Sequence, residues 1–201
     1  MDVRLLDAEP TAEERDAVDA FLGPSLAAWA TDNGHAAHGG HEARSQRHML
    51  LPTLHALHER AGWISPGGLN YVAQRLTVPP ADVYGVATFY ALFSVDERPP
   101  RVVHVCDDIA CRCAGSEELI ADLKERFGPE DTDVNGASWL RSPCLGQCDR
   151  APAAMLTEAG EDPLERELTL VDADGLLGIL EGGTPPEPPS TTPQRTNPSR
   201  T

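Results

Sequence analysis

The sequence is poor in aromatic and basic residues. Of its 201 residues, 5% are Phe, Trp or Tyr, and 16 Lys and Arg stand against 32 Asp and Glu, which gives a net charge of −16. A surface of this charge repels nucleic-acid phosphates and anionic lipid headgroups. We therefore expect no nucleic-acid partner and no adsorption to an anionic membrane.

Long apolar runs are also absent from the sequence. No stretch of about 18 consecutive apolar residues occurs, so we expect no direct membrane insertion. The opening segment, MDVRLLDAEPTAEERDAVDAFLG, is acidic and lacks the basic region and apolar core of a secretory signal. These features predict a cytoplasmic protein, in which disulfides are rare. Five cysteines in that setting indicate a metal site, a redox site or burial.

The first 95 residues carry the apolar spacing of helices. An acidic amphipathic helix is predicted over 11–30, because Thr11 is followed three residues later by Glu14, which is the capping-box arrangement. The small and polar residues that follow predict a loop. We therefore interpret residues 1–47 as an acidic extension followed by a His/Gly-rich loop.

Three more helices are predicted before residue 97. Apolar residues recur at helical spacing over 48–61. Ser65 followed by Pro66 is the pattern of an N-cap and first helical residue, and a further helix is predicted from Pro80. Together these segments predict a helical bundle over 48–97.

The pattern changes after two consecutive prolines at 99 and 100. The β-branched run at 101–105 predicts a strand, and it is followed by alternating helical and extended patterns. The expected order is strand, helix, three strands and a helix, at residues 101–105, 115–127, 138–140, 153–157, 166–171 and 172–180. This order predicts a small α/β domain over 98–181, and the Pro-rich segment 182–201 is interpreted as a disordered tail or linker.

Four of the five cysteines form two closely spaced pairs. Cys106 and Cys111 have four residues between them, and Cys144 and Cys148 have three. Both pairs lie in polar loop segments beside predicted strands or helices, which are poor positions for inert core cysteines. Two such loops brought together would present four thiolates to a metal ion or cluster.

The spacing of the cysteines leaves the metal open. Iron with bridging sulfide prefers thiolate ligands, and zinc accepts four cysteines whose pairs are about two to four residues apart. A zinc-stabilised interaction module is therefore an alternative to an iron–sulfur protein. A thioredoxin-type dithiol normally has two intervening residues, which neither pair has. We interpret Cys113 as a small packing residue, with exchange for Cys111 as a ligand as the alternative.

Several motifs resemble the family of thioredoxin-like [2Fe–2S] ferredoxin subunits of NADH dehydrogenase, which is respiratory complex I. Residues 106–111 (CDDIAC), followed by Gly115, resemble the first cluster motif of that family, and residues 144–152 (CLGQCDRAP) resemble the second. The segments GWI at 62–64 and GVATFY at 85–90 resemble its amino-terminal helical bundle.

The resemblance covers about residues 48–180 and implies an α+β fold, in which a helical bundle precedes a thioredoxin-like α/β domain. It implies one [2Fe–2S] cluster held by Cys106, Cys111, Cys144 and Cys148. Family members serve respiratory NADH dehydrogenase, and close relatives include the gamma subunit of NAD-dependent formate dehydrogenase and subunits of NAD-reducing hydrogenases. The implied role is single-electron exchange within such an oxidoreductase, whose complete active site does not lie on this chain.

The resemblance also implies the partner. FMN and NAD are expected on a flavoprotein subunit of the complex and not on this chain, and no GxGxxG dinucleotide motif occurs in the sequence. Negative charge beside the ligands opposes electron uptake, so Asp107, Asp108 and Asp149 predict a low reduction potential. Amide groups at the start of the helix near residue 115 would offset this effect.

The remaining polar and aromatic residues are interpreted mainly as structural. Four histidines are expected in a solvated loop and not in a second metal site: His35, His38, His41 and His48. His104 is interpreted as a packing residue, with tuning of the cluster as the alternative. Three aromatic residues are expected either to pack in the core or to cover the cluster or the partner surface: Phe89, Tyr90 and Phe93.

Overall fold

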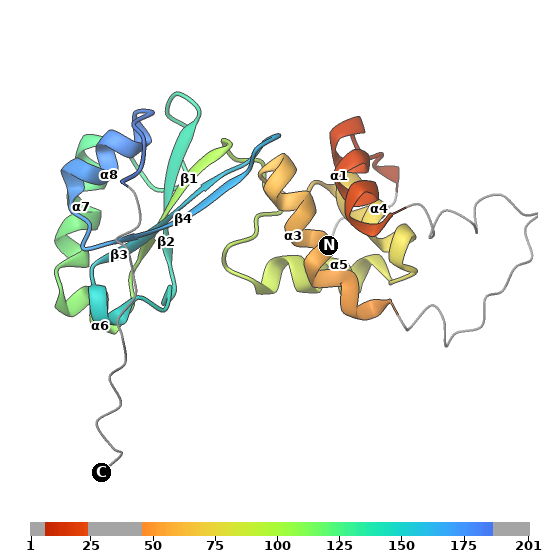
Figure 1. The fold of residues 1–201 in the computed structure, drawn as a ribbon, viewed down its shortest axis with the longest axis horizontal. Coiled ribbons are helices and arrows are strands. Elements are labelled where there is room, and N and C mark those ends of the chain that lie inside the picture. The colour runs from red at the N-terminus through yellow and green to blue at the C-terminus, as the bar shows by residue number, and fades with distance from the viewer. Residues whose placement is uncertain (1–6, 24–45, 187–201) are drawn as a thin grey trace, which may run out of the picture.

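The computed structural model describes residues 7–23 and 46–186. The predicted continuation of the first helix beyond residue 23, most of the His/Gly-rich loop and most of the Pro-rich tail lie outside the described residues. Figure 1 shows the described chain as a group of helices beside a twisted sheet that carries further helices on one face.

Among the described residues, the helical part contains four α-helices and one short 3-10 helix. They are α1 (Ala12–Leu22), η3 (Arg47–Met49), α3 (Leu50–Ala61), α4 (Pro66–Leu76) and α5 (Pro80–Phe89). These helices share one apolar core, in which Val18 of α1, Leu54 and Leu57 of α3, and Val72 of α4 are fully buried. The helical bundle that the periodicity predicts is therefore present.

The predicted helix caps are present. The Thr11 hydroxyl accepts a hydrogen bond from the Glu14 amide (3.2 Å), and the Glu14 carboxylate accepts one from the Thr11 amide (2.7 Å). Ser65 Oγ accepts from the Gly68 amide (2.9 Å) at the start of α4. Gly62 ends α3 with a φ of 82°, which only glycine adopts without strain.

The capping box predicts a measurable stability effect. Thr11→Ala removes the acceptor for the Glu14 amide and is expected to lower the unfolding free energy by about 1 kcal/mol, or the melting temperature by about 2–4 °C. Thr11→Ser keeps the hydroxyl and is the matched control. Thermal denaturation followed by circular dichroism measures both, and equal melting temperatures of the two variants would show that the box contributes nothing.

The second part is built on a mixed four-stranded sheet in the order β2-β1-β3-β4. The strands are β1 (Arg101–Cys106), β2 (Ala137–Ser142), β3 (Ala153–Glu158) and β4 (Leu164–Thr169). β1 pairs parallel with β2 and antiparallel with β3, and β3 pairs antiparallel with β4. The accompanying helices are α6 (Ile109–Cys113), α7 (Ser116–Arg126), η4 (Cys148–Arg150) and α8 (Ala173–Leu180).

This arrangement confirms the predicted α+β class and the order of its main elements. Two details differ from the prediction. A short helix, α6, lies within the first cysteine loop, so Cys111 lies inside a helix and not before one. β4 covers 164–169, whereas the sequence pattern predicts 166–171. Its limits are set by its antiparallel pairing with β3, in which Glu158 at the end of β3 is opposite Leu164 at the start of β4.

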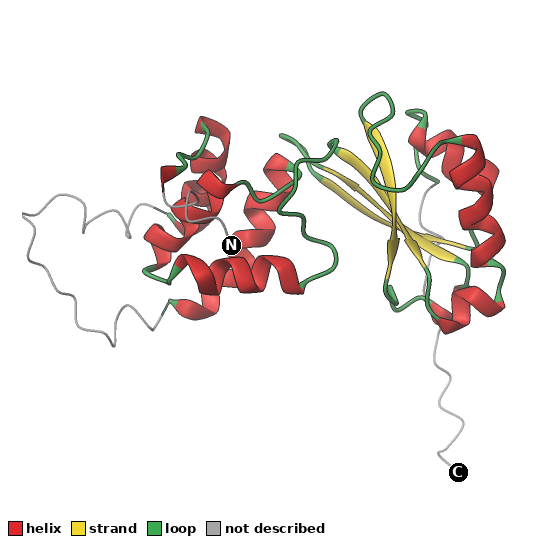
Figure 2. Ribbon diagram, turned by 180° about the vertical axis from the view of Figure 1, so that it is seen from behind, coloured by secondary structure: helices red, strands yellow, loops and turns green. Residues whose placement is uncertain are grey.

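One face of the sheet is covered by α7 and α8, as Figure 2 shows. Alternate strand residues point to this side, and Val103, Leu156 and Trp139 are buried there against both helices. The Trp139 indole N–H donates a hydrogen bond to the Gly128 carbonyl (3.0 Å). The core thus holds β1 and β3 in place, and these strands lead into and out of the cysteine loops.

The helical part contacts the sheet at the turn between β3 and β4. The Gly160 amide donates to the Glu59 carbonyl of α3 (3.1 Å), and the Ala159 amide donates to the Pro100 carbonyl (2.9 Å). Arg60 of α3 pairs with Glu161 of the turn (3.4 Å). Division of the chain into separate domains at residue 97 stays a prediction.

Candidate iron–sulfur site

All four predicted ligands lie at one edge of the sheet. β1 ends at Cys106 and its parallel neighbour β2 ends at Ser142, directly opposite in register. The Asp107 amide donates to the Ser142 carbonyl (2.9 Å), which ties the first loop to the second. Cys144 follows two residues later. The pairing of β1 with β2 therefore brings together two loops that are more than thirty residues apart in sequence.

The first cysteine pair is buried. Cys106 and Cys111 are each 2% exposed and pack against Ala153 at the start of β3, with Leu145 and Ala151 beside them. Asp108 caps α6, since its side chain accepts from the Ile109 amide (2.7 Å), and α6 then places Cys111 beside Cys106. Burial, followed by the hydrogen bond with Cys106, raises the pKa of the Cys111 thiol to about 11.

The second pair is exposed. The Sγ atoms of Cys144 and Cys148 are 3.4 Å apart, and both residues are accessible to solvent. The hydrogen bond with Cys144 raises the pKa of the Cys148 thiol, and the proximity of Cys106 and Asp108 raises it further. Cys106 acts electrostatically on both Cys111 and Cys148, so the two pairs are neighbours.

The donor set fits a two-iron cluster. Each iron of a [2Fe–2S] centre takes two protein thiolates, and here four soft sulfur donors are arranged as two contacting pairs. Within the described ranges, no group of three or more His, Cys, Asp or Glu side chains is placed to hold a single metal ion. The apolar wall of Ala153, Leu145 and Ala151 lies behind the inner pair.

Comparison with known proteins identifies the family. Residues 37–172 match the sequence profile of the thioredoxin-like [2Fe-2S] ferredoxin family. The chain belongs to this family. The family carries a [2Fe–2S] cluster, and the match covers both cysteine pairs and most of the helical part.

Named relatives of this ferredoxin are subunits of NADH-quinone oxidoreductases. The relative from Pseudomonas aeruginosa is 28% identical over 75% of this chain and 89% of its own length. The relative from Escherichia coli is 30% identical over 60% of this chain and 75% of its own length. The relative from Thermus thermophilus, NADH-quinone oxidoreductase subunit 2, is 29% identical over 69% of this chain and 76% of its own length.

A solved structure supports the fold of this ferredoxin. The NAD+-reducing [NiFe]-hydrogenase in the air-oxidized state aligns with a TM-score of 0.51 and 21% identity. The alignment covers 66% of this chain but only 22% of the hydrogenase chain. At this identity the likeness shows a shared fold.

The charge around the thiols differs from the expectation in one respect. The sequence predicts that Asp107 adds negative charge, but its partly buried carboxylate pairs with Arg112 (2.9 Å) and with Arg141 of β2 (3.3 Å). The hydrogen bond from Arg112 holds the pKa of Asp107 below its usual value. The carboxylate is therefore ionised, and two guanidinium groups offset its charge.

One predicted role near the site is corrected. Cys113 is exposed, so it is not a packing residue, because the single turn of α6 directs Cys111 inward and leaves Cys113 at the surface. For the aromatic residues both core packing and a surface role are expected: Phe89 is 79% exposed at the end of α5, which fits the surface role, and Phe93 is buried among the helices. Tyr90 is partly exposed between them.

His104 packs in the interior as predicted. It is 1% exposed on β1, two residues before Cys106, and its Nε2 atom has no hydrogen-bond partner. Burial, followed by the charge of Arg98, lowers the pKa of His104 to about 4.

His35, His38 and His41 lie outside the described residues, and His48 lies in η3. No described helix is long and apolar enough to cross a membrane.

Proposed function

We propose that this chain is the [2Fe–2S] electron-transfer subunit of an NAD(H)-linked dehydrogenase complex of the NADH-quinone oxidoreductase type. Cys106, Cys111, Cys144 and Cys148 are its cluster ligands in this proposal. The observation that carries the proposal is the placement of two thiol pairs, one buried and one exposed, at one edge of the sheet.

When bound, a [2Fe–2S] cluster accepts and releases one electron. The residues of the chain then have distinct tasks. The inner thiols and the apolar wall behind them exclude water from one side, and the outer thiols leave the other side open. In our proposal a flavoprotein subunit that carries FMN and NAD(H) docks over the open side. We place the assembly in the cytoplasm, on the cytoplasmic side of a membrane-bound complex.

Spectroscopy of the whole chain tests the proposal. Protein purified without oxygen is expected to be brown, to contain two irons and two sulfides per chain, and to give an S = 1/2 electron paramagnetic resonance signal after dithionite reduction. Addition of the reduced flavoprotein of the same complex is expected to reduce the cluster. A colourless protein with one zinc and no iron, even after reconstitution with iron and sulfide, would establish the zinc module instead.

The charge pairs of Asp107 predict a shift in potential. Asp107→Asn removes one carboxylate and leaves Arg112 without it, while Arg141 keeps its second partner, Glu130, so we expect the midpoint potential to rise by some tens of millivolts. A unit charge about 10 Å away contributes on the order of 1–2 kcal/mol at an effective dielectric constant of about 20. A redox titration followed by electron paramagnetic resonance measures the shift.

Asp162→Asn is the matched control for this titration. Asp162 lies in the turn between β3 and β4, a strand length of about 20 Å from the cysteine edge, so its removal is expected to leave the potential unchanged. Equal potentials for the wild type and both variants would show that Asp107 does not act on the cluster.

A further inference from the structure

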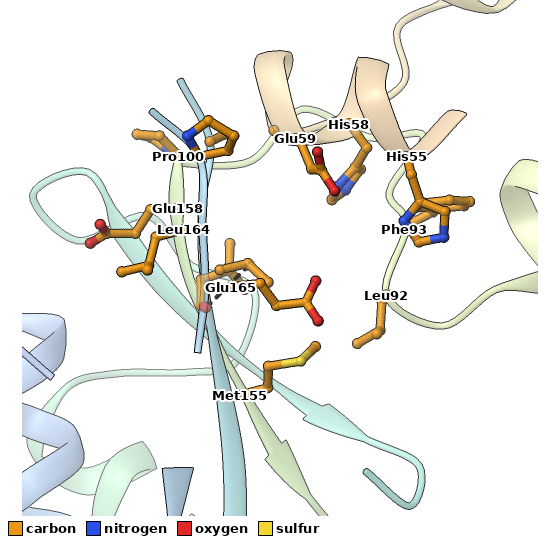
Figure 3. A pocket seen from close by; sticks show the side chains of 15 residues that line it. His55, His58, Glu59, Leu92, Phe93, Pro100, Met155, Glu158, Leu164 and Glu165 are labelled. Carbon is orange, nitrogen blue, oxygen red and sulfur yellow. Dashed lines mark hydrogen bonds between the residues drawn. The ribbon is translucent and has the colours of Figure 1, made fainter. Parts of the chain in front are cut away.

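A cavity separates the helical part from the sheet face opposite α7 and α8. It has a volume of about 180 Å³ and lies between α3, the segment after α5 and the strands β1, β3 and β4. Figure 3 shows Leu92 and Phe93 on one side of it and Met155 on the other. Val102 of β1 and Met155 of β3 are buried at its base. Most of the lining is apolar.

The size of the cavity limits what it can hold. Pockets for drug-sized ligands and cofactors span roughly 300–1,000 Å³. A volume of about 180 Å³ is too small for a nucleotide or flavin and corresponds to about six water molecules at the density of the liquid. A single long side chain or a small ion fills such a space.

Two unpaired carboxylates lie at the rim of the cavity. Glu59 reaches it from α3 and Glu165 from β4, and Figure 3 shows both carboxylates directed toward the hollow. Within the part of the chain that the structure describes, neither carboxylate makes a hydrogen bond or an ion pair, whereas the third one at the cavity, Glu158, pairs with Arg101. The two free carboxylates give the cavity a negative potential.

Neither Lys nor Arg lines the cavity within the described chain, whereas two histidines, His55 and His58, do. His58 lines it, and burial, followed by the charge of Arg98, lowers the pKa of His58 to about 3, so its ring is neutral at pH 7. Arg98 approaches His58 Nε2 (3.5 Å) and donates to the Leu92 carbonyl (3.3 Å), but it is not part of the lining. The two unpaired carboxylates of this mainly apolar cavity therefore have no Lys or Arg of the described chain beside them.

We propose that this cavity receives one Lys or Arg side chain of a partner subunit, with the aliphatic stem against Leu92 and Met155 and the charged end between Glu59 and Glu165. The existence of that partner rests on the proposed function. A chain of net charge −16 favours a basic docking surface on whichever subunit it meets. Glu59 and Glu165 are both exposed at the rim, so the aliphatic stem of such a side chain would be buried while its charged end stays between two accessible carboxylates.

Methionine methyl signals provide a direct test on the full chain. The sequence has three methionines, of which Met155 lines the cavity and Met49 lies in η3, outside the lining. In protein labelled with 13C at the methionine methyl groups, the capped tripeptide acetyl-Gly-Arg-Gly-amide is expected to shift the Met155 signal saturably and to leave Met49 unchanged. The uncharged citrulline analogue is expected to bind at least tenfold more weakly.

Two double variants separate local from general charge effects. Glu59→Gln with Glu165→Gln is expected to weaken the peptide at least tenfold, while Glu118→Gln with Glu125→Gln, on exposed positions of α7, is expected to change its affinity less than twofold. Both variants remove two negative charges. An unchanged Met155 signal before titration shows that the first variant keeps the cavity intact.

Three outcomes would overturn the inference. The first is that the tripeptide does not shift the Met155 signal, and the second is that the citrulline peptide binds as tightly as the arginine peptide. The third is that N-propylguanidine binds and the tripeptide does not, which would assign the cavity to a free small cation. Iron content and the reduced spectrum of the same samples report on the proposed function separately. A chain without a cluster that still binds the tripeptide would contradict the electron-transfer role and leave the cavity assignment intact.

Discussion

Cys106→Ser is expected to abolish the [2Fe–2S] spectrum, and Cys113→Ser is expected to leave it unchanged. The contrast rests on position, because Cys106 is buried against Cys111 and Ala153, whereas Cys113 is exposed at the end of α6. A serine hydroxyl at position 106 is a harder donor than thiolate and would be buried in an apolar environment. We expect less than a tenth of the wild-type iron to remain.

The same series distinguishes the inner pair from the outer pair. Cys111→Ser is expected to match Cys106→Ser, because both thiols are 2% exposed and no other described cysteine is buried with them. Cys144→Ser and Cys148→Ser are expected to lose the native cluster too, but their exposed positions tolerate a hydroxyl, so the chain should fold and express normally. Iron content, the visible spectrum and the reduced electron paramagnetic resonance signal measure each variant.

Ligand exchange is the result that would contradict this set. If Cys111→Ser keeps a cluster and the double variant Cys111→Ser with Cys113→Ser loses it, Cys113 is able to replace Cys111. The structure argues against this exchange, because α6 begins at the Asp108 cap and its single turn directs Cys111 toward Cys106. A native spectrum for Cys106→Ser would remove the inner pair from the site altogether.

Local signals in the sequence predict most of the fold. The capping box at Thr11 and the Ser65–Pro66 start act over three or four residues, so they can be read without knowledge of tertiary contacts. The helix α6 escapes prediction because it is a single turn of five residues, too short to show a period. The limits of β4 depend on its pairing with β3, which is a non-local property.

The candidate site shows the same division between local and non-local information. The spacing and the family resemblance single out all four cysteines from sequence. The sequence does not show that one pair is buried and the other exposed. This difference depends on how Ala153 of β3 packs behind the first loop, which no local pattern reveals. The pairing of Asp107 with Arg141 likewise follows from the parallel register of β1 and β2. The cavity between α3 and the sheet combines residues from five segments and has no sequence signature.

Leu156→Ala is expected to give the largest loss of stability among non-ligand substitutions that we consider. Leu156 is fully buried on β3, one of the two central strands, opposite Val103 of β1 and under α7 and α8. Removing a buried leucine side chain costs about 2–5 kcal/mol, through lost transfer energy and the cavity that remains. For a chain of this size, that corresponds to a fall in melting temperature on the order of 10 °C.

Leu170→Ala is the matched control, because the same atoms are removed from a side chain that is 67% exposed after β4. Its unfolding free energy is expected to change by less than about 0.5 kcal/mol. Thermal denaturation of both cluster-containing variants under anaerobic conditions measures the difference. β3 also begins at Ala153, which packs against Cys106 and Cys111, so the iron of Leu156→Ala should be released at a lower temperature in parallel with unfolding. Release of iron at the wild-type temperature, together with early unfolding of the core, would show that the cysteine loops hold their geometry independently of the sheet.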